Sequence, residues 1–165
     1  MVQSINPTQK NDETDGLPMP KRIWAVVSVG FALCMSVLDV NIINIVLPTL
    51  SHDFGTSPAV TTWIINGYQL AIVVSLLSFS ALGEIIGYRK VYLSGIGLFC
   101  ITSLICALSD SFWTLTIARI FQGFSASAIT SVNTAQLRYI YPKSQLGRGM
   151  GINAMVVAIS AAAGP

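Results

Sequence analysis

Two charged side chains, Asp39 and Arg119, each lie inside a long apolar run of the sequence. An ionisable group at the centre of a bilayer costs about 2.5–3.5 kcal/mol on insertion scales, so such groups face a bundle interior or an aqueous cavity. Asp39 precedes Pro48 by nine residues and Arg119 follows Phe112 by seven, which correspond to about 13 and 10 Å of helix. The two charges are therefore predicted at similar depth and can pair across a helix bundle. We interpret the pair as functional, with a purely structural ion pair as the alternative.

Three amide side chains accompany this pair. Asn41 and Asn44 are three residues apart and share one face of a helix, and Gln122 follows Arg119 at the same spacing. Inside a membrane, an amide hydrogen-bonds to another helix or contacts a ligand, and this spacing is compatible with both roles. We assign all three amides to the wall of a substrate cavity. The adjacent Gly123 is typical of close helix packing.

The composition predicts the elements that carry these residues. Of the 165 residues, 53% are hydrophobic and 10% are charged, and the mean hydropathy is +0.67. Soluble domains carry about 25% charged residues, so the composition argues against a soluble, disordered or coiled-coil protein. The net charge of +2 leaves no basic patch for nucleic acid. We therefore predict an all-α, polytopic membrane protein whose surroundings are a lipid bilayer.

Nothing in the sequence is typical of an enzyme. His52 is the single histidine, and the three cysteines lie in apolar runs without a CxxC or Cys/His pattern. The sequence contains no recognisable Ser/His/Asp set, phosphate-binding loop or zinc-binding pattern. We expect neither catalytic activity nor a bound metal or other cofactor.

Five apolar runs, separated by short polar loops, organise the chain. Each helical span needs about 20 apolar residues. The predicted spans cover residues 24–47, 60–83, 91–108, 112–137 and 149–165, with Pro48 ending the first. Residues 1–21 are interpreted as a flexible cytosolic tail, and residues 22–165 as a transmembrane region with a truncated fifth span. A natural protein rarely stops inside an apolar helix, so we expect an N-terminal fragment of a longer protein or a truncated gene product.

The basic residues predict the orientation. Eight of the nine lie in the N-terminal tail or in the second and fourth loops, none lies in the first or third loop, and the ninth is Arg119. Loops rich in Lys and Arg stay on the cytosolic side of a membrane. We therefore expect a multi-pass protein of the cell membrane (inner or plasma membrane) with a cytosolic N-terminus.

Four segments at successive spans resemble the motifs of one family, although each motif alone is weak. They are residues 38–48 (LDVNIINIVLP), residues 80–90 (SALGEIIGYRK), residues 115–123 (LTIARIFQG) and, in the last run, Gly151, Ser160, Gly164 and Pro165. Together they resemble the first-span, loop, fourth-span and fifth-span motifs of the fourteen-span drug/proton antiporters, a branch of the major facilitator superfamily. Trp63, Tyr68 and Leu70 resemble the entry to the second span in that family.

The resemblance implies part of an N-terminal six-helix bundle that exports small hydrophobic or cationic compounds, driven by the proton motive force without a cofactor. It implies that Asp39 accepts the proton and is coupled to Arg119. Transporters of this kind bind substrate near the midplane between bundle halves and alternate access by rocking. The implied partners are protons, the substrate and a missing C-terminal half. The alternatives are proton-coupled transport of a specific metabolite and a truncated fragment that does not transport.

Two further sets of residues take roles from the resemblance. They are a gating loop, formed by Gly83, Glu84, Gly87, Arg89 and Lys90, and a helix-bend motif, formed by Gly151, Gly164 and Pro165. The sequence supports the loop independently, because Glu84 lies at a predicted helix C-terminus, where the helix dipole disfavours a negative charge. We expect Arg89, Lys90 or the N-terminus of a helix in the missing half to compensate this charge. Gly87 is expected to stop the helix in a left-handed conformation.

Overall fold

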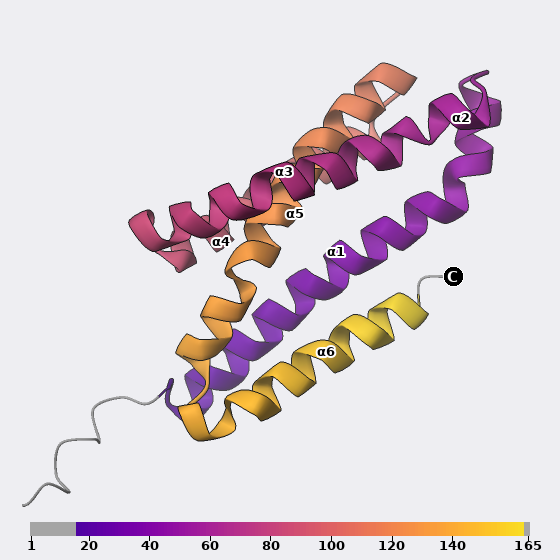
Figure 1. Cartoon of the computed structure of the whole chain (residues 1–165). Coiled ribbons are helices and arrows are strands. Elements are labelled where there is room, and N and C mark those ends of the chain that lie inside the picture. The colour runs from indigo at the N-terminus through magenta and orange to yellow at the C-terminus, as the bar shows by residue number, and fades with distance from the viewer. Residues whose placement is uncertain (1–15, 164–165) are drawn as a thin grey trace, which may run out of the picture.

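The computed structural model describes residues 16–163, and every regular element in this part of the chain is helical (Figure 1). The helices are α1 (Met19–Asp53), α2 (Pro58–Thr61), α3 (Trp63–Ile86), α4 (Tyr88–Ala107), α5 (Phe112–Ile140) and α6 (Leu146–Ala162), with a 3-10 turn at Lys143–Gln145. The predicted all-α class is confirmed.

Three helical segments are long and apolar enough to cross a membrane: α1, the α2–α3 segment of residues 58–86, and α4. The 29 residues of α5 extend over about 44 Å at 1.5 Å per residue, which exceeds a hydrocarbon core of about 30 Å. Part of its polar face is buried in the bundle, where Gln122, Ser125 and Ser127 have no exposed surface. The 17 residues of α6 stand at the lower limit for a span.

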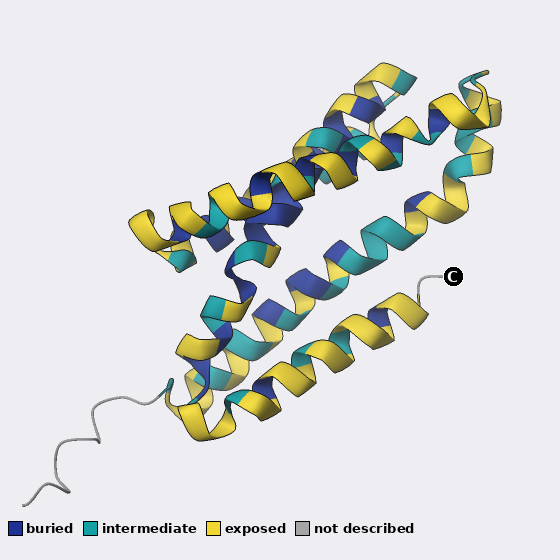
Figure 2. Ribbon diagram, in the orientation of Figure 1, coloured by how far each residue is buried: buried dark blue, intermediate teal, exposed yellow. Residues whose placement is uncertain are grey.

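Helices α3 and α4 both pack against α5 (Figure 1). Small residues allow this approach, because a Cβ atom on Gly123 would lie 2.5 Å from the carbonyl oxygen of Tyr68 in α3. A Cβ atom on Gly95 of α4 would lie 3.3 Å from the carbonyl oxygen of Ser125. Close backbone approach at small residues is typical of helix pairs in membranes. The buried residues in Figure 2 accordingly follow α5 along most of its length.

Helices α1 and α6 run along each other, and α1 also contacts α5 (Figure 1). The segment before α1 is joined to the end of α5, since the backbone N–H of Leu17 donates to the carbonyl of Ile140 at 3.1 Å. Arg22 Nη1 donates to Gln145 Oε1 in the turn before α6, also at 3.1 Å. These contacts fix α1 beside α5, and this placement brings Asp39 to Arg119.

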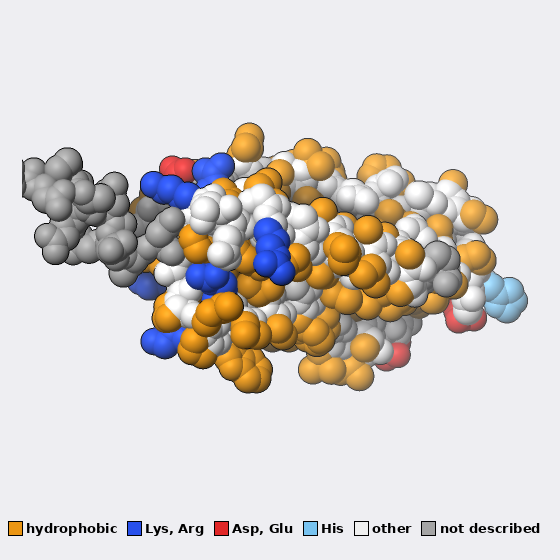
Figure 3. All heavy atoms as spheres, turned by 90° about the horizontal axis from the view of Figure 1, so that it is seen from below, with side chains coloured by type: hydrophobic (Ala, Val, Ile, Leu, Met, Phe, Trp, Pro, Cys, Tyr) orange, Lys and Arg blue, Asp and Glu red, His pale blue; other side chains and the backbone are white. Residues whose placement is uncertain are grey.

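The outer surface of the described helices is apolar. Leu77 and Ile85 are each 80% exposed and Trp24 is 76% exposed. Figure 3 shows hydrophobic side chains over much of the viewed face, with Lys and Arg gathered toward one end and the histidine at the opposite end. Such a surface is suited to contact with lipid or with further helices rather than with water.

The N-terminal boundary differs from the predicted one. Helix α1 begins at Met19, so Lys21 belongs to its first turn, together with Arg22, rather than to a flexible tail. Pro20 does not disturb this start, because the first N–H groups of a helix have no intrahelical acceptor. Residues 1–15 of the predicted tail lie outside the described residues.

Pro48 does not end the first helix, contrary to the sequence-based expectation. Helix α1 continues through it to Asp53. The proline lacks the N–H that would donate to the carbonyl of Asn44, so the helix continues without one of its hydrogen bonds. At the end of the helix, the N–H of Phe54 donates to the carbonyl of Leu50 at 3.0 Å and Ser51 Oγ donates to the carbonyl of Thr56 at 2.7 Å. Proline is tolerated inside membrane helices.

Candidate functional site

Asp39 on α1 and Arg119 on α5 form a buried ion pair. Arg119 Nη1 donates to Asp39 Oδ2 at 2.6 Å, and the two side chains are 7% and 18% exposed, respectively. The similar depths predicted from the sequence agree with this contact, which joins residues 80 positions apart. A buried charge without a partner is strongly destabilising, so each residue makes the other tolerable in the bundle.

Gln122 completes the environment of the carboxylate. Its Nε2 donates to Asp39 Oδ1 at 3.1 Å, while its Oε1 accepts from Arg119 Nη1 at 3.0 Å. Cys106 Sγ on α4 also donates to Gln122 Oε1 at 3.4 Å. Gln122 was assigned to the cavity wall from the sequence, but its side chain is fully buried within this network. Both carboxylate oxygens of Asp39 are therefore held by donors from α5.

The donors of Arg119 are not all used. Its Nε atom is fully buried and has no hydrogen-bond partner among residues 16–163. A buried polar group without a partner costs about 1–3 kcal/mol. The guanidinium group therefore retains the capacity to donate to one more acceptor when the network rearranges.

Tyr68 on α3 is a site residue that the chemical reading of the sequence did not select. The ring of Tyr68 lies beneath the guanidinium group, with Arg119 Cζ 5.8 Å from the ring centroid. This geometry is a cation–π contact. An aromatic residue in an apolar run gives no local signal that separates a site residue from a lipid-facing one. The one indication in the sequence was that Tyr68 lies between Trp63 and Leu70, in the segment that resembles the entry to the second span of the antiporter family.

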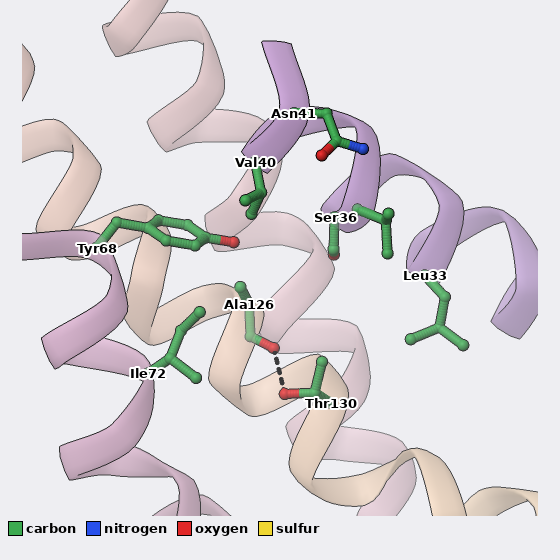
Figure 4. Close-up of a pocket in the computed structure, with 9 residues that line it drawn as sticks. Leu33, Ser36, Val40, Asn41, Tyr68, Ile72, Ala126 and Thr130 are labelled. Atoms are coloured by element: carbon green, nitrogen blue, oxygen red, sulfur yellow. Dashed lines mark hydrogen bonds between the residues drawn. The ribbon is translucent and has the colours of Figure 1, made fainter. Parts of the chain in front are cut away.

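An apolar cavity of about 260 Å³ lies next to the ion pair, between α1, α3 and α5 (Figure 4). Its wall consists of Leu33, Ser36, Val37, Val40, Asn41, Tyr68, Ile72, Ala126 and Thr130. Two of these residues, Val40 and Asn41, directly follow Asp39, and Tyr68 contacts Arg119. The cavity and the ion pair therefore share their walls, although neither Asp39 nor Arg119 lines the cavity itself.

The other two predicted cavity amides lie in different places. Asn41 contributes to the cavity wall, and its Nδ2 donates to the carbonyl of Ala161 on α6 at 3.4 Å. Asn44 does not line the cavity, since it is exposed and its Nδ2 donates to the carbonyl of Val40 in its own helix at 3.1 Å. Asn44 lies about 4.5 Å further along α1 than Asn41, the last residue of this helix that lines the cavity.

The predicted gating loop lies at the junction of α3 and α4, away from the ion pair. Gly87 separates the two helices with φ of +98°, a conformation that favours glycine. Gly83 is buried, and a Cβ atom there would lie 2.8 Å from the ring of Tyr88. Glu84 is exposed and forms no ion pair among residues 16–163, so Arg89 and Lys90 do not supply the expected compensation in this structure.

The predicted helix-bend motif is described only in part. Gly151 lies in α6 with nothing within 4 Å of the position that a Cβ atom would take, while Gly164 and Pro165 lie outside the described residues. Within residues 16–163, no group of three or more His, Cys, Asp or Glu side chains is arranged to hold a metal ion.

Comparison with known proteins places this site in a family. Residues 29–165 match the Major Facilitator Superfamily. The chain is 52% identical over 153 residues to the uncharacterized transporter YebQ of Escherichia coli (strain K12), a match that covers 93% of this chain and 34% of the relative. It is 32% identical to the riboflavin transporter RibZ of Clostridioides difficile (strain 630), with 88% and 32% covered. It is 33% identical to the tetracenomycin C resistance and export protein of Streptomyces glaucescens, with 96% and 31% covered.

The chain spans about a third of the length of the curated relatives it matches. The match to the family nevertheless extends over most of the chain and includes α1 from Val29 onward and all the later helices. It therefore contains both partners of the ion pair and every wall of the cavity. The chain belongs to the Major Facilitator Superfamily of membrane transporters.

Proposed function

We propose that this chain is part of a proton-coupled exporter of small hydrophobic or cationic compounds, in the fourteen-span drug/proton antiporter branch of the superfamily. The observation that carries the proposal is the Asp39 carboxylate, buried against Arg119 and Gln122 beside an apolar cavity of about 260 Å³. Intramembrane ionisable groups of this kind mark ion and proton pathways. The tetracenomycin C export protein and the drug efflux pump JefA of Mycobacterium tuberculosis, 31% identical, support export of small molecules.

Asp39 takes the proton in this mechanism. Its two oxygens accept from Arg119 Nη1 and Gln122 Nε2, so a proton that arrives on either oxygen weakens these hydrogen bonds and the attraction to Arg119. The charge of the pair then changes from zero to +1. A displaced Arg119 has a second unused donor in Nε, and the network must rearrange to satisfy it. Proton binding is thereby linked to movement of α5 against α1.

The same charge change drives the exchange of substrate. With Asp39 ionised, the pair has no net charge and a cationic compound can occupy the adjacent cavity. Protonation leaves the positive charge of Arg119 uncompensated, which repels the cation and favours its release. The proton at Asp39 and the cation in the neighbouring cavity therefore oppose each other's binding, which is the requirement for antiport driven by the proton motive force. No metal or organic cofactor takes part in these steps.

The rest of the transporter is part of the proposal. We place the N-terminus in the cytosol and the protein in the cell (inner or plasma) membrane, supported by the Lys and Arg side chains gathered toward one end of the molecule (Figure 3). A C-terminal half would close the open side of the cavity. The loop formed by Gly83, Glu84 and Gly87 would contact that half and control closure on the cytosolic side.

Transport of one specific metabolite is a second candidate function. It is supported by the 32% identity to the riboflavin transporter RibZ, which is similar in extent to the identity with the export proteins. The two candidates differ in selectivity. A metabolite transporter accepts one compound and its near analogues, whereas an exporter of hydrophobic compounds accepts chemically unrelated cations.

Inside-out membrane vesicles from cells that produce the whole gene product test the proposal. With an imposed proton gradient, vesicles are expected to accumulate ethidium and tetraphenylphosphonium, and an uncoupler should abolish this accumulation. Asp39→Asn should abolish it too, while Asp53→Asn, which changes an exposed carboxylate on the same helix, should leave it unchanged. Accumulation that does not depend on the proton gradient, or that persists in Asp39→Asn, contradicts proton coupling at Asp39. Accumulation of riboflavin alone would favour the metabolite transporter.

A further inference from the structure

The donor groups of most polar side chains in the cavity wall already form hydrogen bonds to backbone carbonyls. Ser36 Oγ donates to the carbonyl of Ala32 at 2.9 Å, and Thr130 Oγ1 donates to the carbonyl of Ala126 at 2.9 Å. Asn41 Nδ2 donates outwards to α6. The aliphatic side chains that form the rest of the wall have no donors at all. A ligand that enters the cavity therefore meets few free hydrogen-bond donors.

The hydroxyl of Tyr68 is the exception. Its side chain is 4% exposed and lines the cavity, and its hydroxyl forms no hydrogen bond with any residue between 16 and 163. In Figure 4, this hydroxyl points away from α3 into the space between Val40 and Ala126. A phenol O–H in an apolar environment normally finds a partner. The cavity thus contains one donor that lacks an acceptor.

Two contacts hold Tyr68 in place. Its backbone is pressed against Gly123 of α5, where even a Cβ atom would lie 2.5 Å from the Tyr68 carbonyl oxygen. Its ring lies against the guanidinium group of Arg119, with 5.8 Å between Cζ and the ring centroid. The hydroxyl therefore has a fixed direction before any ligand binds, and a fixed donor discriminates between ligands better than a mobile one.

We propose that Tyr68 determines the substrate specificity of the cavity by donating its O–H to a hydrogen-bond acceptor on an otherwise apolar compound. The acceptor is a ketone or ester oxygen or an unprotonated ring nitrogen, and the apolar remainder packs against Leu33, Val37 and Ile72. This inference rests on the proposed function, because it names the class of compound that the same cavity takes. The contact with Arg119 places the acceptor next to the proton site, so occupancy of the cavity and protonation of Asp39 act on neighbouring atoms.

A pair of matched cations tests the inference on the purified whole gene product. The probes are (4-acetylphenyl)triphenylphosphonium and (4-isopropylphenyl)triphenylphosphonium, which share charge and approximate shape but differ in the carbonyl acceptor. The wild-type protein is expected to bind the acetyl probe more tightly. Tyr68→Phe should weaken binding of the acetyl probe by about fivefold, the effect of one neutral hydrogen bond, and leave the isopropyl probe unchanged. Tyr139→Phe, at a tyrosine that is 79% exposed, is the matched control and should change neither Kd.

The ratio of the two Kd values decides the inference, because a fall in the folded fraction of Tyr68→Phe affects both probes equally. An unchanged ratio, or equal weakening of both probes, shows that the hydroxyl does not bind the acceptor and overturns the inference while the exporter stands. Failure of the wild-type protein to bind either probe overturns the exporter and the inference together. If Tyr68→Phe loses the preference for the acetyl probe while the wild-type protein and Tyr139→Phe keep it, the result supports both the exporter and the role of Tyr68.

Discussion

Replacement of Gly123 by alanine is expected to separate α3 from α5 and to destabilise the protein. The new Cβ atom would lie 2.5 Å from the carbonyl oxygen of Tyr68 and 2.9 Å from Ala71 Cβ. Ordinary contacts begin at 3.4 Å, so the first of these contacts is short by about 0.9 Å, the difference between 3.4 and 2.5 Å. A backbone carbonyl in a helix cannot rotate away as a flexible side chain can, so the helices themselves must separate.

The size of the effect follows from two opposing contributions. Overpacking of a close contact costs about 1–3 kcal/mol, whereas alanine is more favourable than glycine in a helix by roughly 0.8–1 kcal/mol. Gly123→Ala should therefore lower the free energy of unfolding by up to roughly 2 kcal/mol. Gly97→Ala on α4 is the matched control, because nothing lies within 4 Å of the position of its Cβ atom. That variant should be as stable as the wild-type protein or more stable.

The assay is denaturation of the purified whole gene product in mixed detergent micelles, followed by circular dichroism. Gly123→Ala should also impair proton-coupled accumulation of ethidium, since separation of α3 from α5 moves the Tyr68 ring away from Arg119. If Gly123→Ala and Gly97→Ala unfold at the same denaturant concentration, then α3 and α5 do not approach as closely as described. The argument that close packing of α3 against α5 fixes the position of Tyr68 would then also fail.

Two further predictions concern the orientation and the loop between α3 and α4. In a background that lacks the three native cysteines, Asp110→Cys should react with an impermeant thiol reagent from outside the cell and Ser144→Cys should not, and the reverse pattern would refute the cytosolic N-terminus. Glu84→Gln should slow transport with little change in KM, because Glu84 lies sixteen residues along α3 from Tyr68, or about 24 Å at 1.5 Å per residue. Glu84→Asp is the control that keeps the charge. A large rise in KM with normal kcat would show that Glu84 belongs to the binding site.

The ion pair was predictable from the sequence for an energetic reason. A charge in an apolar helix is costly enough that it must face a partner or water, and the constant rise of a helix converts sequence position into depth. Those two facts place Asp39 and Arg119 at similar depth and make a pair possible, and the structure shows that the pair forms. The role of Gln122 was not predictable in the same way, because an amide costs less to bury and its partner depends on side-chain reach.

Other features of the site depend on three-dimensional contacts that leave little trace in the sequence. Tyr68 belongs to the site because Gly123 admits α3 close to α5 and brings the ring to Arg119. Asn44 falls outside the cavity because the cavity ends at Asn41, about 4.5 Å earlier along α1. Pro48 was expected to end α1, but the helix continues to Asp53 without the one hydrogen bond that the proline cannot donate.

Proton release on substrate binding tests most directly whether Asp39 is the proton site. Purified whole gene product in weakly buffered solution is mixed with ethidium across a range of pH values, and released protons are measured with an indicator dye. We predict release from the wild-type protein and from Asp53→Asn, and none from Asp39→Asn at any pH. Release from Asp39→Asn with an unchanged pH dependence would place the proton site elsewhere and leave the pair of Asp39 and Arg119 with a purely structural role.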